Sequence, residues 1–123
     1  MDKTELKQYG TILTAKRIEL ASQLRKRDGI AIEKTPDASD EVRLAAEREL
    51  MTRKLEQESK RLRDVQAALE RIEQGIYGVC LNCEEEIRPK RLNAVPWASL
   101  CIDCQELEDQ HRHGHSEGLP KAA

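Results

Sequence analysis

Four cysteines arranged in two pairs are the residues of this sequence best suited to chemistry. The pairs are Cys80-x-x-Cys83 and Cys101-x-x-Cys104, and seventeen residues separate them. Two such pairs about 15–20 residues apart are typical of structural Zn²⁺ sites, in which four thiolates surround the metal as a tetrahedron. Because four thiolates leave no coordination position for water, we expect one zinc ion that stabilises a small domain and takes no part in a reaction.

Other uses of four cysteines are weaker alternatives. Two disulfides suit an oxidising compartment, whereas the start of the chain, Met1 to Glu5, has no signal-peptide pattern and predicts a cytoplasmic protein. A thioredoxin-like Cys-x-x-Cys needs a βαβ context, which the sequence does not show. An iron–sulfur cluster also takes four thiolates, and the spacing alone does not distinguish it from zinc.

Three basic residues between the cysteine pairs, Arg88, Lys90 and Arg91, are candidate contacts for phosphate or for an acidic protein surface. An equally good interpretation is a solvated loop, whose charge the glutamates at 84–86 balance. The sequence leaves both interpretations open for each residue.

Apolar residues in the same segment, Ile87 and Trp97, are expected to form the core of the small zinc domain, which needs some apolar filling. Near the C-terminus, His111, His113 and His115 could bind a further metal. They lie beside polar residues and glycine, so we expect plain solvated histidines there.

The composition limits which structures can position these residues. The chain has 123 residues, of which 36% are charged and 38% apolar, with no Phe and a single Trp, so a large globular core is not expected. Its 21 basic and 23 acidic residues nearly cancel, which argues against non-specific binding to DNA. No apolar run approaches the roughly 20 residues that span a bilayer, so no membrane partner is expected.

Apolar periodicity predicts two long helices. The first runs from Asp2 to about Arg27, and Gly29 and Pro36 predict a turn after it. Its apolar stripe consists of Leu6, Tyr9, Leu13, Ile18, Leu20 and Leu24. The second runs from about Pro36 to Gly75, a plausible helix end. Its heptad positions hold Leu44, Met51, Leu55, Leu62, Val65, Leu69, Ile72 and Ile76, with Arg48 and Glu58 as polar exceptions. A sustained heptad indicates a coiled-coil seam.

The expected fold is therefore mainly α. Residues 1–75 form a long antiparallel coiled-coil hairpin with its tip near 28–42. Residues 76–110 form a small four-cysteine zinc-finger domain that ends in a short C-terminal helix near 105–110. Residues 111–123 have no apolar period and are expected to be a disordered tail.

The segment around the cysteines resembles the zinc finger of the DksA/TraR family. The resemblance rests on Tyr77-Gly78 before the first cysteine, on Arg91-Leu92-x-Ala94-x-Pro96-x-Ala98 before the third, and on Ile102-Asp103-Cys104 at the fourth. It continues without gaps to a stretch, Pro36 to Val42, that resembles the family's Asp-x-x-Asp-x-Ala tip motif, and it covers about residues 2–115.

The resemblance implies a regulator of bacterial RNA polymerase that is not an enzyme and binds no promoter sequence. Such proteins seat their globular part at the rim of the polymerase secondary channel, where Arg88, Lys90 and Arg91 would be candidate contacts, and insert the hairpin tip to modulate initiation. The tip residues would be Asp37, Asp40 and Val42, the last replacing the family's alanine.

The two tip aspartates are three residues apart, so on a helix they share a face and could contact basic elements or bias Mg²⁺ coordination. Carboxylates at a helix N-terminus can equally well serve only to stabilise that helix, by about 0.3–1 kcal/mol each. The family resemblance favours the functional interpretation.

Two departures from the family pattern carry expectations of their own. Glu84 stands where most relatives have Gly after the second cysteine, a residue that eases the turn. The family's basic residues for guanosine tetraphosphate correspond to Asp64, Val95 and Gln105. Because an acid repels a polyphosphate and neither Val nor Gln supplies positive charge, we expect that this nucleotide site is not built.

Two other functions are considered. A zinc-ribbon module could bind nucleic acid or another protein directly through the basic cluster, but the charge is near neutral and no aromatic residues interleave that cluster. Transcript cleavage through Mg²⁺ recruited by the tip is a third function, which the finger motif disfavours. The sequence does not indicate the target promoters, the direction of regulation or the oligomeric state.

Overall fold

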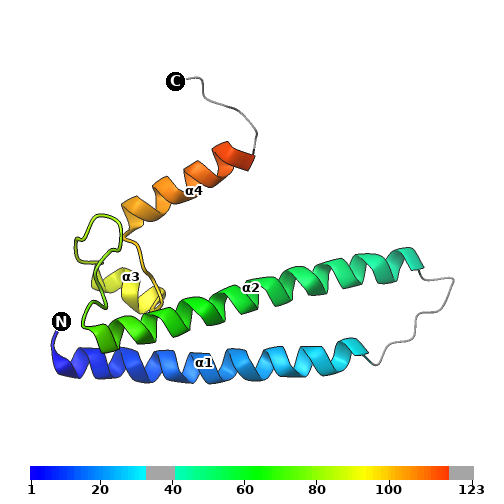
Figure 1. The fold of residues 1–123 in the computed structure, drawn as a ribbon, viewed down its shortest axis with the longest axis horizontal. Helices are drawn as coiled ribbons and strands as arrows, with labels where there is room; N and C mark the ends of the chain where they lie inside the picture. The colour runs from blue at the N-terminus through cyan, green and yellow to red at the C-terminus, as the bar shows by residue number, and fades with distance from the viewer. Residues whose placement is uncertain (33–40, 117–123) are drawn as a thin grey trace.

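A computed structural model describes residues 1–32 and 41–116. Within these ranges the chain forms the helices α1 (Lys3–Ile32), α2 (Glu41–Gln74), α3 (Pro89–Ala94) and α4 (Ile102–Ser116). Figure 1 shows α1 and α2 as a long antiparallel pair, with the segment that carries α3 lying against one end of the pair and α4 pointing away from it. This arrangement confirms the expected mainly helical fold with a long hairpin.

The first helix is longer than the sequence predicted. Residues 28–32 are helical, although a turn was expected from residue 28 onward. Glycine within a helix costs only about 1 kcal/mol, so Gly29 does not by itself end α1. Residues 33–40, which include the predicted tip residues Asp37 and Asp40, lie outside the described residues.

The seam of the hairpin follows the predicted heptad with two corrections. Leu13 and Leu20 of α1 are buried against Val65 and Ala68 of α2. Ile18, by contrast, is 58% exposed, because it lies two residues before Leu20 and thus about 200° around the helix from it. The second correction is at the other end of the heptad. Ile76 is also exposed, since α2 ends at Gln74.

The end of α2 forms the glycine cap that the sequence indicated. Gly75 has a φ of +78°, and its N–H donates to the carbonyl oxygen of Ile72 at 3.2 Å. The N–H of Ile76 donates to the carbonyl oxygen of Arg71 at 3.0 Å. These are the two hydrogen bonds of a Schellman motif, which favours glycine because a Cβ is unfavourable at positive φ. The helix therefore ends where the composition of the chain changes.

The finger and the hairpin share one core. Ile87, Leu92 and Ala98 of the finger belong to the same buried cluster as Leu13 and Val65 of the hairpin. Burial of Ile87 agrees with its predicted place in the core, whereas Trp97 is half-buried and packs against the edge of the cluster. The finger thus gains much of its apolar contact from the hairpin.

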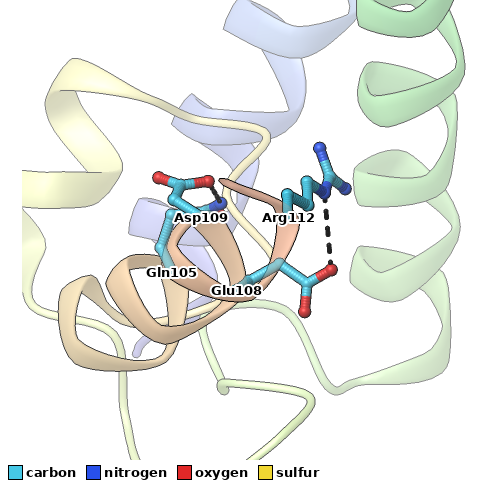
Figure 2. Close-up of polar contacts among 4 residues, drawn as sticks. All are labelled: Gln105, Glu108, Asp109 and Arg112. Carbon is cyan, nitrogen blue, oxygen red and sulfur yellow. Dashed lines mark hydrogen bonds and ion pairs between the residues drawn. The ribbon is translucent and has the colours of Figure 1, made fainter. Parts of the chain in front are cut away.

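The last helix is also longer than expected. α4 includes residues 111–116, which the sequence assigned to a tail, while residues 117–123 lie outside the described residues. Figure 2 shows two pairs spaced four residues apart along α4. Nε2 of Gln105 donates to Oδ1 of Asp109 at 3.0 Å, and Nε of Arg112 lies 3.5 Å from Oε1 of Glu108. Such pairs stabilise a helix without an apolar stripe, which is why apolar periodicity did not predict it.

Among the described residues, no helix combines the length and the apolar character that a membrane span requires.

Candidate metal centre

The four cysteines of the finger come together in space, although they span residues 80–104. Their Sγ atoms all lie within 4.8 Å of one another, and those of Cys83 and Cys101 are 3.8 Å apart. Four sulfurs at about 2.3 Å from a central Zn²⁺ form a tetrahedron with edges of about 3.8 Å. The geometry of this cluster therefore fits one zinc ion bound by Cys80, Cys83, Cys101 and Cys104.

The first cysteine pair lies in a tight backbone turn. The N–H of Cys80 donates to the carbonyl oxygen of Glu85 at 2.8 Å, and the N–H of Glu84 donates to the carbonyl oxygen of Cys80 at 3.0 Å. Glu84 closes the turn with a φ of +64°, in the left-handed region. This is the position at which the sequence lacks the family's glycine, and a side chain is unfavourable at such a φ.

The second pair is held by the start of α4 and by contacts with the first pair. Cys104 lies in the first turn of α4, and its N–H is 3.5 Å from Sγ of Cys101. Nδ2 of Asn82 lies 3.5 Å from Sγ of Cys104, and the N–H of Leu81 donates to the carbonyl oxygen of Ser99 at 2.9 Å. Donors to sulfur orient metal ligands and stabilise their charge. The sequence does not predict this contact of Asn82, because any residue can occupy the middle of a Cys-x-x-Cys pair.

The cysteines differ in their tendency to ionise. Burial opposes ionisation of Cys80, but the backbone N–H groups of Cys83, Cys101 and Asn82 outweigh it and lower the pKa of Cys80 to about 6. The N–H of Glu85 favours the Cys83 thiolate, yet the neighbouring sulfurs, first that of Cys80, raise the pKa of Cys83 to about 12. Four thiolates so close together therefore need a cation to neutralise them.

The three basic residues predicted as rim contacts are not equivalent. Arg88 and Lys90 are exposed, at the start of α3. Arg91 is half-buried, and its Nε donates to the carbonyl oxygen of Leu100 at 2.8 Å. Arg91 thus contributes to the internal structure of the finger, next to the second cysteine pair.

The remaining predicted site residues are not part of the cysteine cluster, although Gln105 directly follows Cys104 and its N–H donates to the carbonyl oxygen of Cys101 at 2.9 Å. Val42, in the first turn of α2, is 86% exposed. Asp64 is half-buried on α2, Val95 packs against the core, and Gln105 is hydrogen bonded to Asp109 within α4. His111 is exposed on α4.

Two tyrosines, which the sequence placed in the apolar stripe and in the finger motif, connect the finger with α1. The hydroxyl of Tyr9 donates to Oδ1 of Asn93 at 2.7 Å, and the ring centroids of Tyr9 and Tyr77 are 5.5 Å apart. The hydroxyl of Tyr77 donates to the carbonyl oxygen of Pro96 at 2.7 Å, and burial raises the pKa of Tyr77. The sequence did not indicate that these two residues meet, since they belong to different elements.

Comparisons with known proteins agree with this geometry. Residues 75–110 match the family model of the prokaryotic dksA/traR C4-type zinc finger. The chain is 30% identical over 112 residues to the RNA polymerase-binding transcription factor DksA of Salmonella typhimurium, which covers 89% of this chain and 74% of that protein. It is also 51% identical over 45 residues to an uncharacterised protein of Aquifex aeolicus, covering 37% of this chain and 31% of the relative.

A solved structure is similar over most of the fold. The transcription factor DksA2 of Pseudomonas aeruginosa superposes with a TM-score of 0.79 at 30% identity, covering 92% of this chain and 89% of that one. The likeness therefore includes the hairpin as well as the finger.

Proposed function

We propose that this chain, which belongs to the DksA/TraR family of C4-type zinc-finger proteins, is a non-enzymatic transcription factor that binds bacterial RNA polymerase. It inserts the tip of the hairpin into the secondary channel and modulates initiation without reading a promoter sequence. The observation that carries the proposal is the similarity to a polymerase-binding factor along 89% of the chain, hairpin and finger together. A finger alone would support only a generic zinc module.

The dimensions of the hairpin suit this function. The 34 residues of α2 extend over about 50 Å, while two helices side by side are only about 20 Å wide. Such a rod can enter a channel that excludes a globular domain. The finger broadens one end of the rod, as Figure 1 shows, and so provides a surface that can rest on the channel rim.

The zinc ion has a structural function in this proposal. The four thiolates of Cys80, Cys83, Cys101 and Cys104 would complete its coordination and hold the two halves of the finger together. Arg88 and Lys90, both exposed, are the stronger candidates for rim contacts, since Arg91 is engaged within the finger.

At the tip, Asp37 and Asp40 supply the carboxylates that act near the polymerase active centre, and Val42 lies next to them in the sequence. The test compares wild-type protein with the double variant Asp37→Asn/Asp40→Asn in polymerase binding and in initiation. We expect both proteins to bind with similar affinity and only the wild type to alter initiation. The matched control is Glu49→Gln/Glu56→Gln, which removes two exposed carboxylates of α2 and should behave as wild type.

If the wild-type protein does not bind polymerase, the proposed function is wrong. A salt-dependent shift of DNA in the absence of polymerase would instead favour a module that binds nucleic acid directly.

The same proposal excludes a guanosine tetraphosphate site of the usual kind. Asp64, Val95 and Gln105 occupy the positions where the family's basic residues would stand, and none of them attracts a polyphosphate. Labelled guanosine tetraphosphate should therefore show no additional binding when this protein joins polymerase. An added site of micromolar affinity would contradict this part of the proposal.

A further inference from the structure

The covalent link between the hairpin and the finger does not by itself set the angle between them. It consists of residues 75–78, and both of its ends are glycines at positive φ, Gly75 at +78° and Gly78 at +86°. Glycine has the widest range of backbone conformations, so a link that begins and ends with it is easily reoriented. Contacts between side chains must therefore hold the finger in place.

One of these contacts comes from a buried cation. Arg71, in the last turn of α2, is only 7% exposed, which is rare for arginine. Its Nη2 lies 3.3 Å from the carbonyl oxygen of Trp97 and 3.4 Å from that of Ala98. Both carbonyls belong to the segment of the finger between α3 and the second cysteine pair. A buried guanidinium is tolerated only with such acceptors, so Arg71 and this segment depend on each other.

A second cation of α2, Arg61, contacts the side chain of Trp97. The guanidinium carbon of Arg61 lies 4.3 Å from the centroid of the Trp97 ring, within the distance of a cation–π interaction. Arg61 is exposed, whereas Trp97 is half-buried and packs against the core. One arginine of α2 therefore holds the backbone of Trp97 and another covers its ring.

A further contact attaches the finger to α1. Tyr9 donates a hydrogen bond to Asn93 at 2.7 Å, at a sequence separation of 84 residues. Contacts from both helices thus reach the finger, and they do so through residues that bind no metal.

We propose that Arg61 and Arg71 are positioning residues that clamp Trp97 and thereby fix the orientation of the finger on the hairpin. The effect of this clamp on polymerase binding rests on the proposed function. A rotation of about 10° at this joint moves the far end of a helix about 50 Å long by about 9 Å. A factor that engages a channel rim with its finger and the channel interior with its tip needs that angle to be constant.

Trp97 is the single tryptophan of the chain, so its fluorescence reports on the clamp alone. We compare wild type with Arg61→Gln, Arg61→Lys and Arg71→Gln in their zinc-loaded forms. In Arg61→Gln and Arg71→Gln, acrylamide should quench Trp97 about twofold more efficiently, because its ring is less covered. Arg61→Lys keeps a cation over the ring and should restore most of the protection. Arg63→Gln, an exposed arginine two residues further along α2, is the matched control and should not differ from wild type.

The same proteins are then titrated with RNA polymerase. Arg61→Gln should bind about fivefold more weakly, with an unchanged zinc content, and Arg61→Lys should recover most of the affinity. If Trp97 is quenched equally in wild type, Arg61→Gln and folded Arg71→Gln, the clamp does not exist. If Arg61→Gln weakens polymerase binding without changing Trp97, Arg61 contacts polymerase directly and is not a positioning residue.

A wild-type protein that fails to bind polymerase would contradict the proposed function, while the quenching comparison would still decide the existence of the clamp. If Arg71→Gln does not fold, the Arg61 variants and the Arg63→Gln control decide it without that variant.

Discussion

Glu84 and Cys80 lie four residues apart in the first cysteine turn, and each is held in a state that its residue type does not favour. Glu84 has a left-handed backbone, and Cys80 is buried with its thiol pKa lowered to about 6. Hydrogen bonds of the turn hold the backbone of Glu84, whereas backbone N–H groups, including that of Cys101 outside the turn, favour the Cys80 thiolate. The metal site thus depends on backbone geometry as much as on the four sulfurs.

The backbone of Glu84 leads to a stability prediction. Replacing Glu84 with Gly removes the Cβ that makes a φ of +64° unfavourable, at the expense of a more flexible unfolded chain. We expect Glu84→Gly to raise the free energy of unfolding of the zinc-loaded protein by about 0.5–1 kcal/mol, as measured by denaturant titration. Glu85→Gly, the matched control next to it, should lower that free energy. A Glu84→Gly protein less stable than wild type would contradict the prediction.

Ionisation of Cys80 can be measured in the metal-free protein. Its pKa in the folded state, about 6, lies below that of an unfolded cysteine, about 8.5. The thiolate therefore stabilises the fold above about pH 8.5, and this contribution is lost as the pH falls toward about 6. Absorbance at 240 nm should show one thiolate forming near pH 6 in wild type and none in Cys80→Ser. Retention of that transition in the variant would assign it to another cysteine.

At the scale of elements, two glycines of the hairpin have opposite functions. Gly10 lies within α1, and a Cβ there would meet Cδ1 of Ile72 at 3.9 Å, an ordinary contact. Gly75 ends α2 at positive φ, where a side chain is unfavourable whatever the space around it. The first glycine is replaceable, whereas the second forms the cap.

This difference predicts opposite effects of the same substitution. Gly10→Ala should raise the free energy of unfolding by about 0.5–1 kcal/mol, because alanine favours the helix and fits the seam. Gly75→Ala should lower it by about 1–2 kcal/mol. Circular dichroism at 222 nm during denaturant unfolding measures both. If Gly10→Ala destabilises the protein, α1 and α2 approach each other more closely than the structure indicates.

At the scale of the whole molecule, the hairpin and the finger share one hydrophobic core. Tyr77, Ile87 and Leu92 are buried together with Leu13 and Val65, so the finger is not an independent domain attached to a rod. Loss of the finger's structure would expose apolar residues of both helices.

Zinc removal should therefore affect the hairpin as well. We expect that a chelator, or the variant Cys104→Ser, lowers the thermal melting temperature of the helical signal at 222 nm, because the finger loses the ion that links its two cysteine pairs. Cys104→Ser should also abolish stoichiometric zinc binding, as measured by metal analysis. A helical melting curve that is unchanged on chelation would indicate that the two parts fold independently.

Local spacing in the sequence predicted three parts of this protein. The cysteine pairs predicted a cluster that fits zinc, the heptad predicted the hairpin, and Gly75 predicted the end of α2. Each of these predictions rests on residues a few positions apart, whose spacing in a helix or turn fixes their relative position. Even so, apolar periodicity misplaced Ile18 and missed the length of α4, which polar pairs stabilise.

The contacts that hold the finger on the hairpin appear only in the folded molecule. Tyr9 and Asn93 are 84 residues apart, Arg71 reaches carbonyls 26 and 27 residues away, and Arg61 covers the ring of Trp97. These contacts depend on the angle between elements, and no periodicity within a single helix encodes that angle. These side chains meet only after the shared core has brought the finger against both helices, and that core is assembled from residues far apart in the sequence, from Leu13 to Cys104.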